Sequence, residues 1–179
     1  RVGLYDLNFC TNADKLAPAD YDGDGKTDLA VYKPSTGVFF IYRSSDGGDG
    51  SAYWGLPEDI PCPADFDGDG KADVAIFRPS TGTFWIRRSA SGNAPLAMQY
   101  GTAGDQPVVG DYDGDGKADV AVYRPTTGIW YIHLSQNNGD TAVQFGIPSD
   151  KAVPGDFDGD GKTDVAVYRT QTGLWFIVN

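Results

Sequence analysis

One acidic motif of nine residues occurs four times in the sequence, in segments 20–28, 65–73, 111–119 and 156–164. The copies begin 45, 46 and 45 residues apart. Each has Asp at positions 1, 3, 5 and 9, Gly at positions 4 and 6, an aromatic residue at position 2 and Lys at position 7. Such a loop supplies the hard oxygen ligands that Ca²⁺ prefers, six to eight of them at about 2.3–2.6 Å. The motif therefore predicts four cation sites, one in each repeat.

The loop chemistry favours Ca²⁺ over the alternatives. Mg²⁺ demands a stricter geometry and usually keeps several waters. A polar Asp-Gly turn would not need the same four carboxylates in every copy, because these repel one another when no ion is bound. The glycines allow the positive φ angles that a tight wrap requires. The predicted ligands are the four Asp side chains and the backbone carbonyl of the position-7 Lys, whose ammonium group is expected to point away from the ion: Asp20, Asp22, Asp24, Lys26, Asp28, Asp65, Asp67, Asp69, Lys71, Asp73, Asp111, Asp113, Asp115, Lys117, Asp119, Asp156, Asp158, Asp160, Lys162 and Asp164.

The residues that follow each loop separate this motif from the EF-hand. An EF-hand loop ends in a bidentate Glu at position 12 and lies between helices. Position 12 here is an apolar residue inside a β-branched run, namely Val31, Ile76, Val122 or Val167. Each loop is therefore expected between two strands.

An Asp-x-Asp-Gly-Asp-Gly loop followed by Leu/Val-Ala-Val/Ile-Tyr/Phe resembles the FG-GAP/VCBS repeats, and VCBS-like repeats are the closer comparison. The resemblance covers all four repeats, which make up nearly the whole chain. It implies blades of a calcium-binding β-propeller, similar to those of integrin α-subunit head domains and of some fungal and bacterial lectins.

The period and the strand patterns indicate how the loops are positioned. A period near 45 residues is typical of a propeller or another repeat array. Strand signals dominate, so residues 1–179 are predicted to form one all-β domain, a small β-propeller of four four-stranded blades. The first strands are expected at 17–19, 62–64, 108–110 and 153–155, the second at 29–32, 74–77, 120–123 and 165–168, the third at 38–42, 83–87, 129–133 and 174–178, and the ends of the fourth at 53–55, 99–101 and 144–146.

The last repeat stops before its fourth strand. Residues 7–10 align with the end of the preceding fourth strand at 144–146, so the segment 3–10 is expected to pair with 174–178 and to close the last blade. Within one chain this pairing closes a monomeric ring, which we favour because the termini of a closed ring lie close together. Between chains it gives a domain-swapped dimer or a head-to-tail fibre.

Composition excludes several classes of function. The chain has 179 residues and a formal net charge of −11, and the four loops hold 16 of its 25 acidic residues. This acidity argues against nucleic-acid binding, which requires a basic face, and no apolar run is long enough to span a membrane. The chain begins at Arg1 without an initiator Met, as expected of a mature or excised segment. Extracellular calcium modules bind with a Kd of roughly 10⁻⁴–10⁻³ M, so a secreted or cell-surface location is expected.

Other recurring residues allow two interpretations each. Basic residues end the second strands (Lys33, Arg78, Arg124 and Arg169), and an acid precedes each by 19 residues (Asp14, Asp59, Asp105 and Asp150). These are predicted to form repeated ion pairs rather than an anion-binding ring. The aromatic pairs of the third strands are predicted to be mostly core, although some could stack on sugars: Phe39/Phe40, Phe84/Trp85, Trp130/Tyr131 and Trp175/Phe176. No disulfide is predicted between Cys10 and Cys62, because their blades are not adjacent.

The sequence leaves three functions open. His133 has no triad partner at a recognisable spacing, and no carboxylate pair outside the loops is placed as acid and base. The protein is therefore predicted to be no enzyme but a non-catalytic adhesion, interaction or structural assembly module, whose protein or glycan partner is unknown. A lectin, or the non-catalytic propeller of a polysaccharide-degrading enzyme, is the alternative. Self-assembly through the N-terminal strand would suit the first of these.

Overall fold

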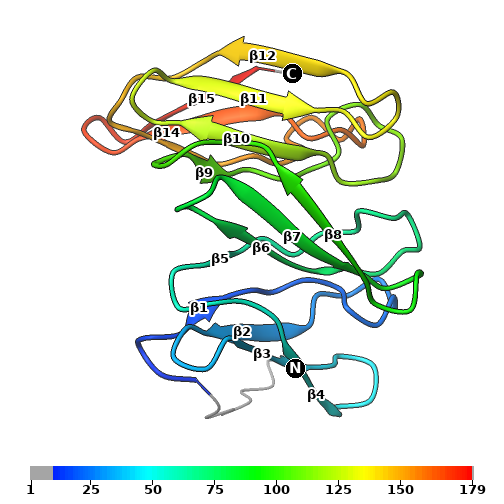
Figure 1. Ribbon diagram of the computed structural model, residues 1–179. Coiled ribbons are helices and arrows are strands. Elements are labelled where there is room, and N and C mark those ends of the chain that lie inside the picture. Colours follow the sequence, from blue (N-terminus) through cyan, green and yellow to red (C-terminus); the bar gives the residue numbers. More distant parts are fainter. Residues whose placement is uncertain (1–9, 179) are drawn as a thin grey trace, which may run out of the picture.

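The computed structural model of the protein describes residues 10–178, which form four antiparallel sheets in chain order. The fold is all-β, a four-blade β-propeller, as predicted. The first and second blades lie at the bottom and middle of Figure 1, and the fourth lies at the top behind the third. The strands are β1 (Lys15–Leu16), β2 (Leu29–Lys33), β3 (Val38–Tyr42) and β4 (Asp49–Tyr53) in blade one; β5 (Ile60–Pro61), β6 (Val74–Arg78), β7 (Thr83–Arg88) and β8 (Ala94–Gln99) in blade two; β9 (Gln106–Pro107), β10 (Val120–Arg124), β11 (Ile129–His133) and β12 (Asp140–Gln144) in blade three; and β13 (Asp150–Ala152), β14 (Val165–Arg169) and β15 (Leu174–Val178) in blade four.

The predicted second and third strands are confirmed to within one residue, but the outer boundaries were wrong. The first strands begin about two residues earlier, and the predicted small-residue segments carry only isolated bridges such as Ala19 to Asp28. Blade three has Val109 where the other blades have Pro18, Pro63 and Pro154 and carries the same isolated bridge, so the short first strand does not depend on proline. The fourth strands end before the aromatic-Gly pair that was expected to close them, and the glycines there have φ between +123° and +143°.

Each blade has two apolar faces, which we name by the neighbour that they meet. The forward face, toward the next blade, is formed in blade one by Ala30, Tyr32, Phe39 and Ile41. The backward face, toward the preceding blade, is formed in blade two by Val74, Ile76 and Trp85. Three buried clusters join a forward face to the next backward face, between blades one and two, two and three, and three and four. Packing between neighbouring blades is therefore the core of the protein.

Three of the four predicted ion pairs are present, each between a half-buried Arg and a buried Asp. Arg124 Nε and Nη2 donate to Asp105 Oδ1 and Oδ2 at 2.8 and 2.9 Å, and Asp105 Oδ2 also accepts the backbone N–H of Thr102 at 2.9 Å. A two-pronged contact of this kind fixes orientation as well as charge. The same arrangement joins Arg78 to Asp59 and Arg169 to Asp150. In the first blade, Lys33 Nζ instead lies 4.8 Å from the ring centre of Phe40.

Several expectations concern the N-terminal segment. The prediction that 3–10 closes the last blade rests on residues 1–9, which lie outside the described residues, and within 10–178 β15 pairs with β14 alone.

Both cysteines are free thiols, Cys10 exposed and Cys62 buried. Residues 10–178 contain no helix that could cross a bilayer.

Replacing Arg124 by Gln tests the ion pairs. Burial raises the pKa of Asp105, but the hydrogen bonds from Arg124 and Thr102 outweigh burial and hold that pKa below its usual value. A lowered folded-state pKa adds stability above the unfolded pKa of about 3.9, and this stability is lost as the pH falls through the folded pKa. We expect Arg124→Gln to lower the free energy of unfolding by about 2 kcal/mol at neutral pH, and the difference from the wild type to shrink below about pH 4.

Urea titrations at several pH values measure this difference. Arg87→Gln is the control, because Arg87 forms no ion pair with a carboxylate in the described part of the chain. Equal losses for the two variants, or a loss at Arg124 that does not change with pH, would contradict the ion-pair assignment.

Candidate metal centres

The four acidic loops lie at the same end of the blades. Each connects the first strand of a blade to the second, and Figure 1 shows all four on the right of the view. Backbone hydrogen bonds link consecutive loops, because the position-8 N–H of one loop donates to the position-1 carbonyl of the loop before it. The distances are 2.6 Å for Ala72 to Asp20, 2.7 Å for Ala118 to Asp65 and 2.6 Å for Thr163 to Asp111. The loops thus form a continuous row across the propeller.

Every loop gathers three carboxylates with one oxygen of each within 4.8 Å of the others. Three loops use positions 1, 3 and 9, and the third loop uses positions 1, 3 and 5. Of the 16 carboxylates predicted as ligands, 12 are thus brought together: Asp20, Asp22, Asp28, Asp65, Asp67, Asp73, Asp111, Asp113, Asp115, Asp156, Asp158 and Asp164. The four left out are Asp24, Asp69, Asp119 and Asp160. The lysine carbonyls stay a prediction.

The position-1 aspartate shapes the loop. Asp20 Oδ1 accepts the N–H of Gly23 at 2.7 Å, and Oδ2 accepts the N–H of Gly25 at 2.8 Å. Both glycines have φ near +81°, a conformation that residues with a Cβ seldom adopt. The other three loops repeat the two bonds. The Asp-Gly spacing therefore fixes the backbone that presents the remaining carboxylates.

The position-9 aspartate holds the loop to the rest of its blade. Asp28 is fully buried, and its two oxygens accept the N–H groups of Tyr21 at 2.9 Å and Ser44 at 2.7 Å. Asp73 and Asp119 make the equivalent bonds. One carboxylate thus ties the loop to a serine one or two residues beyond the third strand. This contact was not anticipated from the sequence, where position 9 was treated only as a ligand.

A serine at a fixed offset accounts for the position-5 aspartates. The hydroxyl groups of Ser44, Ser89 and Ser135 lie 2.8–3.1 Å from Asp24, Asp69 and Asp115, always 20 residues further along the chain. That constant offset is the signal by which the serines could have been found. In the first loop the Lys26 ammonium lies 3.1 Å from Asp24 Oδ2 on a side chain that is 71% exposed, and the direction of the lysines relative to an ion stays a prediction.

The electrostatics of the loops fit a bound cation. Burial raises the pKa of Asp73, and the nearby Asp67 carboxylate raises it further against the hydrogen bonds that lower it. Asp119 and Asp113 show the same relation. Asp67 Oδ1 is buried and has no hydrogen-bond partner among the described residues. Burying like charges, or a carboxylate oxygen that has no hydrogen-bond partner, costs free energy. A cation coordinated by these oxygens removes that cost. The donors are all oxygens, the set that a hard divalent ion prefers.

Comparison with known proteins identifies the repeats and the fold. The family described as FG-GAP-like repeat matches the chain over residues 20–76, 65–122 and 111–167. A lectin of Agrocybe aegerita, whose structure concerns specific recognition of non-reducing terminal N-acetylglucosamine, superposes with a TM-score of 0.57 at 18% identity over 89% of this chain and 49% of the lectin chain. BBS1N, solved in complex with ARL6DN, superposes with a TM-score of 0.51 at 12% identity over 92% of this chain and 55% of the other. This chain thus spans about half the length of both, and no curated protein matches its sequence.

Two substitutions in one loop separate the structural carboxylate from the proposed ligand. Asp67→Asn removes the negative charge beside Asp73 and keeps an oxygen that can accept the N–H of Ala90, now 3.1 Å from Asp67 Oδ2, so in chelator it is expected to leave the melting temperature unchanged or to raise it slightly. Asp73→Asn places an amide against two N–H donors and is expected to cost about 1–3 kcal/mol already in chelator, before any loss of a metal ligand is felt. With calcium at ten times its Kd, Asp67→Asn is expected to lose about 1.4 kcal/mol of ligand-induced stabilisation.

Thermal unfolding in chelator and in calcium distinguishes these effects. The outcome that contradicts the assignment is equal destabilisation by both variants in chelator.

Proposed function

Because the chain belongs to the FG-GAP-like repeat family, we propose that it is a calcium-stabilised, non-catalytic module that binds a partner. The observation that carries the proposal is the presence of one triad of carboxylates per blade, in loops that are hydrogen-bonded across blade boundaries. An ion in such a loop neutralises the carboxylate of a residue such as Asp20, whose backbone carbonyl accepts a hydrogen bond from the neighbouring blade. Calcium is thus proposed to act on the assembly of the propeller rather than on a chemical step.

Charge and location support the choice of calcium. Four divalent ions would add eight positive charges to a chain whose formal net charge is −11, so metal binding removes most of the self-repulsion. Loops of modest affinity fill only where calcium is near millimolar, as it is outside cells. We accordingly place the protein at the cell surface or in the secreted fraction.

A binding role suits the remaining acidic groups. Outside the loops, three of the buried carboxylates are engaged by Arg78, Arg124 and Arg169. Hydrogen bonds from Arg124 and Arg169 hold the pKa of Asp105 and Asp150 below the usual value despite burial, whereas a general acid requires a raised pKa. The partner is proposed to be a protein or a glycan, and the acidic surface disfavours nucleic acid.

Removal of calcium tests the proposal directly. At ten times Kd each site adds about 1.4 kcal/mol, so four independent sites add roughly 6 kcal/mol. We expect excess chelator to lower the melting temperature strongly, calcium to restore it, and magnesium to restore it poorly. Native mass spectrometry is expected to count four ions. An unchanged melting curve in chelator would overturn the metal assignment.

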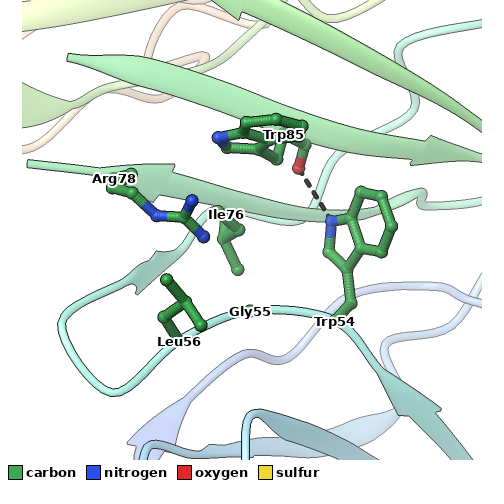
Figure 2. Close-up of a pocket in the computed structure, with 6 residues that line it drawn as sticks. All are labelled: Trp54, Gly55, Leu56, Ile76, Arg78 and Trp85. Carbon is green, nitrogen blue, oxygen red and sulfur yellow. Dashed lines mark hydrogen bonds between the residues drawn. The ribbon is translucent and has the colours of Figure 1, made fainter. Parts of the chain in front are cut away.

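A carbohydrate is the second candidate partner, because a recurring cavity lies between blades. Between blades one and two a cavity of about 220 Å³ is lined by Trp54, Gly55, Leu56, Ile76, Arg78 and Trp85. Figure 2 shows the two indoles and the guanidinium around it, with Trp54 Nε1 donating to the backbone oxygen of Trp85 at 3.0 Å. Between blades two and three a cavity of about 300 Å³ is lined by the equivalent residues and by Asp140: Tyr100, Gly101, Thr102, Val122, Arg124 and Tyr131.

Aromatic faces beside fixed polar groups suit a sugar. The apolar face of a sugar ring packs on indole or phenol, while its hydroxyl groups require oriented donors and acceptors. Arg78 is such a donor, held in place by Asp59 and by the Trp85 ring, whose centre lies 5.4 Å from its guanidinium carbon. Trp85 Nε1 is buried and has no hydrogen-bond partner within the described part of the chain. The similarity to the Agrocybe aegerita lectin favours a test with glycans that end in N-acetylglucosamine.

A glycan array in calcium, followed by calorimetry on the best ligand, tests the second candidate. Trp54→Ala is expected to weaken binding at the first cavity about tenfold or more, because it removes one stacking wall. The control is Tyr53→Ala, which alters the exposed neighbouring residue and is expected to leave binding intact. Binding that survives Trp54→Ala and Tyr100→Ala together, in a protein that still melts cooperatively, would rule out these cavities.

A further inference from the structure

The forward face of blade four is exposed, although its counterparts are buried. Trp175 and Ile177 in this face are 52% and 42% exposed. The residues at the same register in the other blades, Phe39, Phe84 and Trp130 for Trp175, are all 0% exposed. Phe157, the position-2 aromatic of the fourth loop, is 46% exposed, whereas its equivalents pack into the clusters between blades. The face has the composition of an interface but no blade of residues 10–178 covers it.

The backward face of blade one is open only in part. Leu29 is 50% exposed and Leu16 is 78% exposed, whereas Val31 between them is 3% exposed, as buried as its counterparts Ile76, Val122 and Val167. The residues equivalent to Leu29 in blades three and four, Val120 and Val165, are 4% and 7% exposed because a preceding blade packs against them. Clustered apolar exposure of this kind marks an interaction surface.

The three internal interfaces define what each open face accepts. In all of them a forward face built from Ala, an aromatic residue and Ile meets a backward face built from β-branched residues and a second aromatic. Ile132 and Val165 share one buried cluster, as do Ile86 and Val120, so Ile177 and Leu29 are matched in type and register. The chain thus carries both halves of a fourth interface. It does not join them itself, since the two blades lie at opposite ends of the array (Figure 1).

We propose that a second copy of this chain covers both faces. The forward face of blade four in each copy packs on the backward face of blade one in the other, which makes two equivalent contacts related by a two-fold axis. A head-to-tail contact closes when the rotations add up to a full turn. Propellers typically have four to eight blades. Two copies together have eight blades, the upper end of that range, and three copies would have more.

The mass of the full chain in solution is the first test. Light scattering in calcium and physiological salt, which screens the net negative charge, is expected to give twice the chain mass of 19.1 kDa at high concentration. A mass of one chain at every concentration overturns the proposal. A distribution that grows with concentration beyond two chains overturns the closed ring, because it shows an open head-to-tail polymer.

Charged substitutions on the two faces test which surfaces meet. Ile177→Lys and Leu29→Glu each place a charge in both contacts, so each variant alone is expected to weaken association about tenfold or more. Both positions are exposed in the single chain, so at concentrations too low for the wild type to dimerise the unfolding temperatures are expected to equal the wild-type value. Ile147→Lys is the matched control: Ile147 is 42% exposed like Ile177, but it lies in the loop between β12 and β13, so this variant is expected to dimerise normally.

Mixing the two variants separates this geometry from every other. A mixed pair has one contact that is wild type on both sides and one in which the Ile177→Lys and Leu29→Glu substitutions face each other with opposite charges. We therefore expect the mixture to dimerise although neither variant does. If Leu29→Glu dimerises alone, or if the mixture stays monomeric while the control dimerises, the head-to-tail assignment is wrong.

Discussion

The structure depends on one constraint: the second strand of each blade is apolar on both of its faces. Residues such as Ala75, Ile76 and Phe77 are successive along the chain and all fully buried, so both sides of the sheet must be kept from water. A sheet with two apolar faces needs a covering layer on each side, and in this chain the neighbouring blades supply that layer. When such a sheet is repeated, the blades form an array in which each blade shields an apolar face of the next from water. As in other repeat proteins, stability is then largely a property of the contacts between neighbours.

The acidic loops are organised by the same neighbour contacts. The position-1 carbonyl of Asp20 accepts the N–H of Ala72 in the next blade, while the side chain of Asp20 accepts N–H groups within its own loop. The position-9 carboxylate of Asp28 reaches a serine two residues beyond the third strand. The carboxylates therefore hold the backbone and, in the proposed function, also the ion. Their backbone bonds offset part of the repulsion within each loop, and a cation would offset the rest, most directly at Asp67 Oδ1, which no group of residues 10–178 contacts by a hydrogen bond.

Much of this arrangement follows from the sequence, because period and alternation are local signals. The β-branched runs predicted the second strands, and the fixed offset of 19 residues predicted the pairing of Arg124 with Asp105. The sequence did not predict which of several possible hydrogen-bonding or charged partners a given side chain contacts. It could not show that backbone N–H groups occupy both oxygens of Asp28, nor that Lys33, with one compact ammonium group, would prefer the face of Phe40 to a carboxylate.

Repetition also makes exposure informative. Trp130 and Trp175 are the same residue at the same register in adjacent blades, yet one is fully buried and the other is half exposed. Neither local sequence nor strand geometry accounts for the difference, which leaves only the presence or absence of a following blade. An end blade held on one side alone has fewer apolar contacts and separates from its neighbour more readily. Separation would also pull apart the hydrogen bonds between consecutive loops, such as the one from Thr163 to Asp111. A cation bound in the loops and a second chain on the end faces, as proposed, would therefore both oppose the same motion, the separation of one blade from the next.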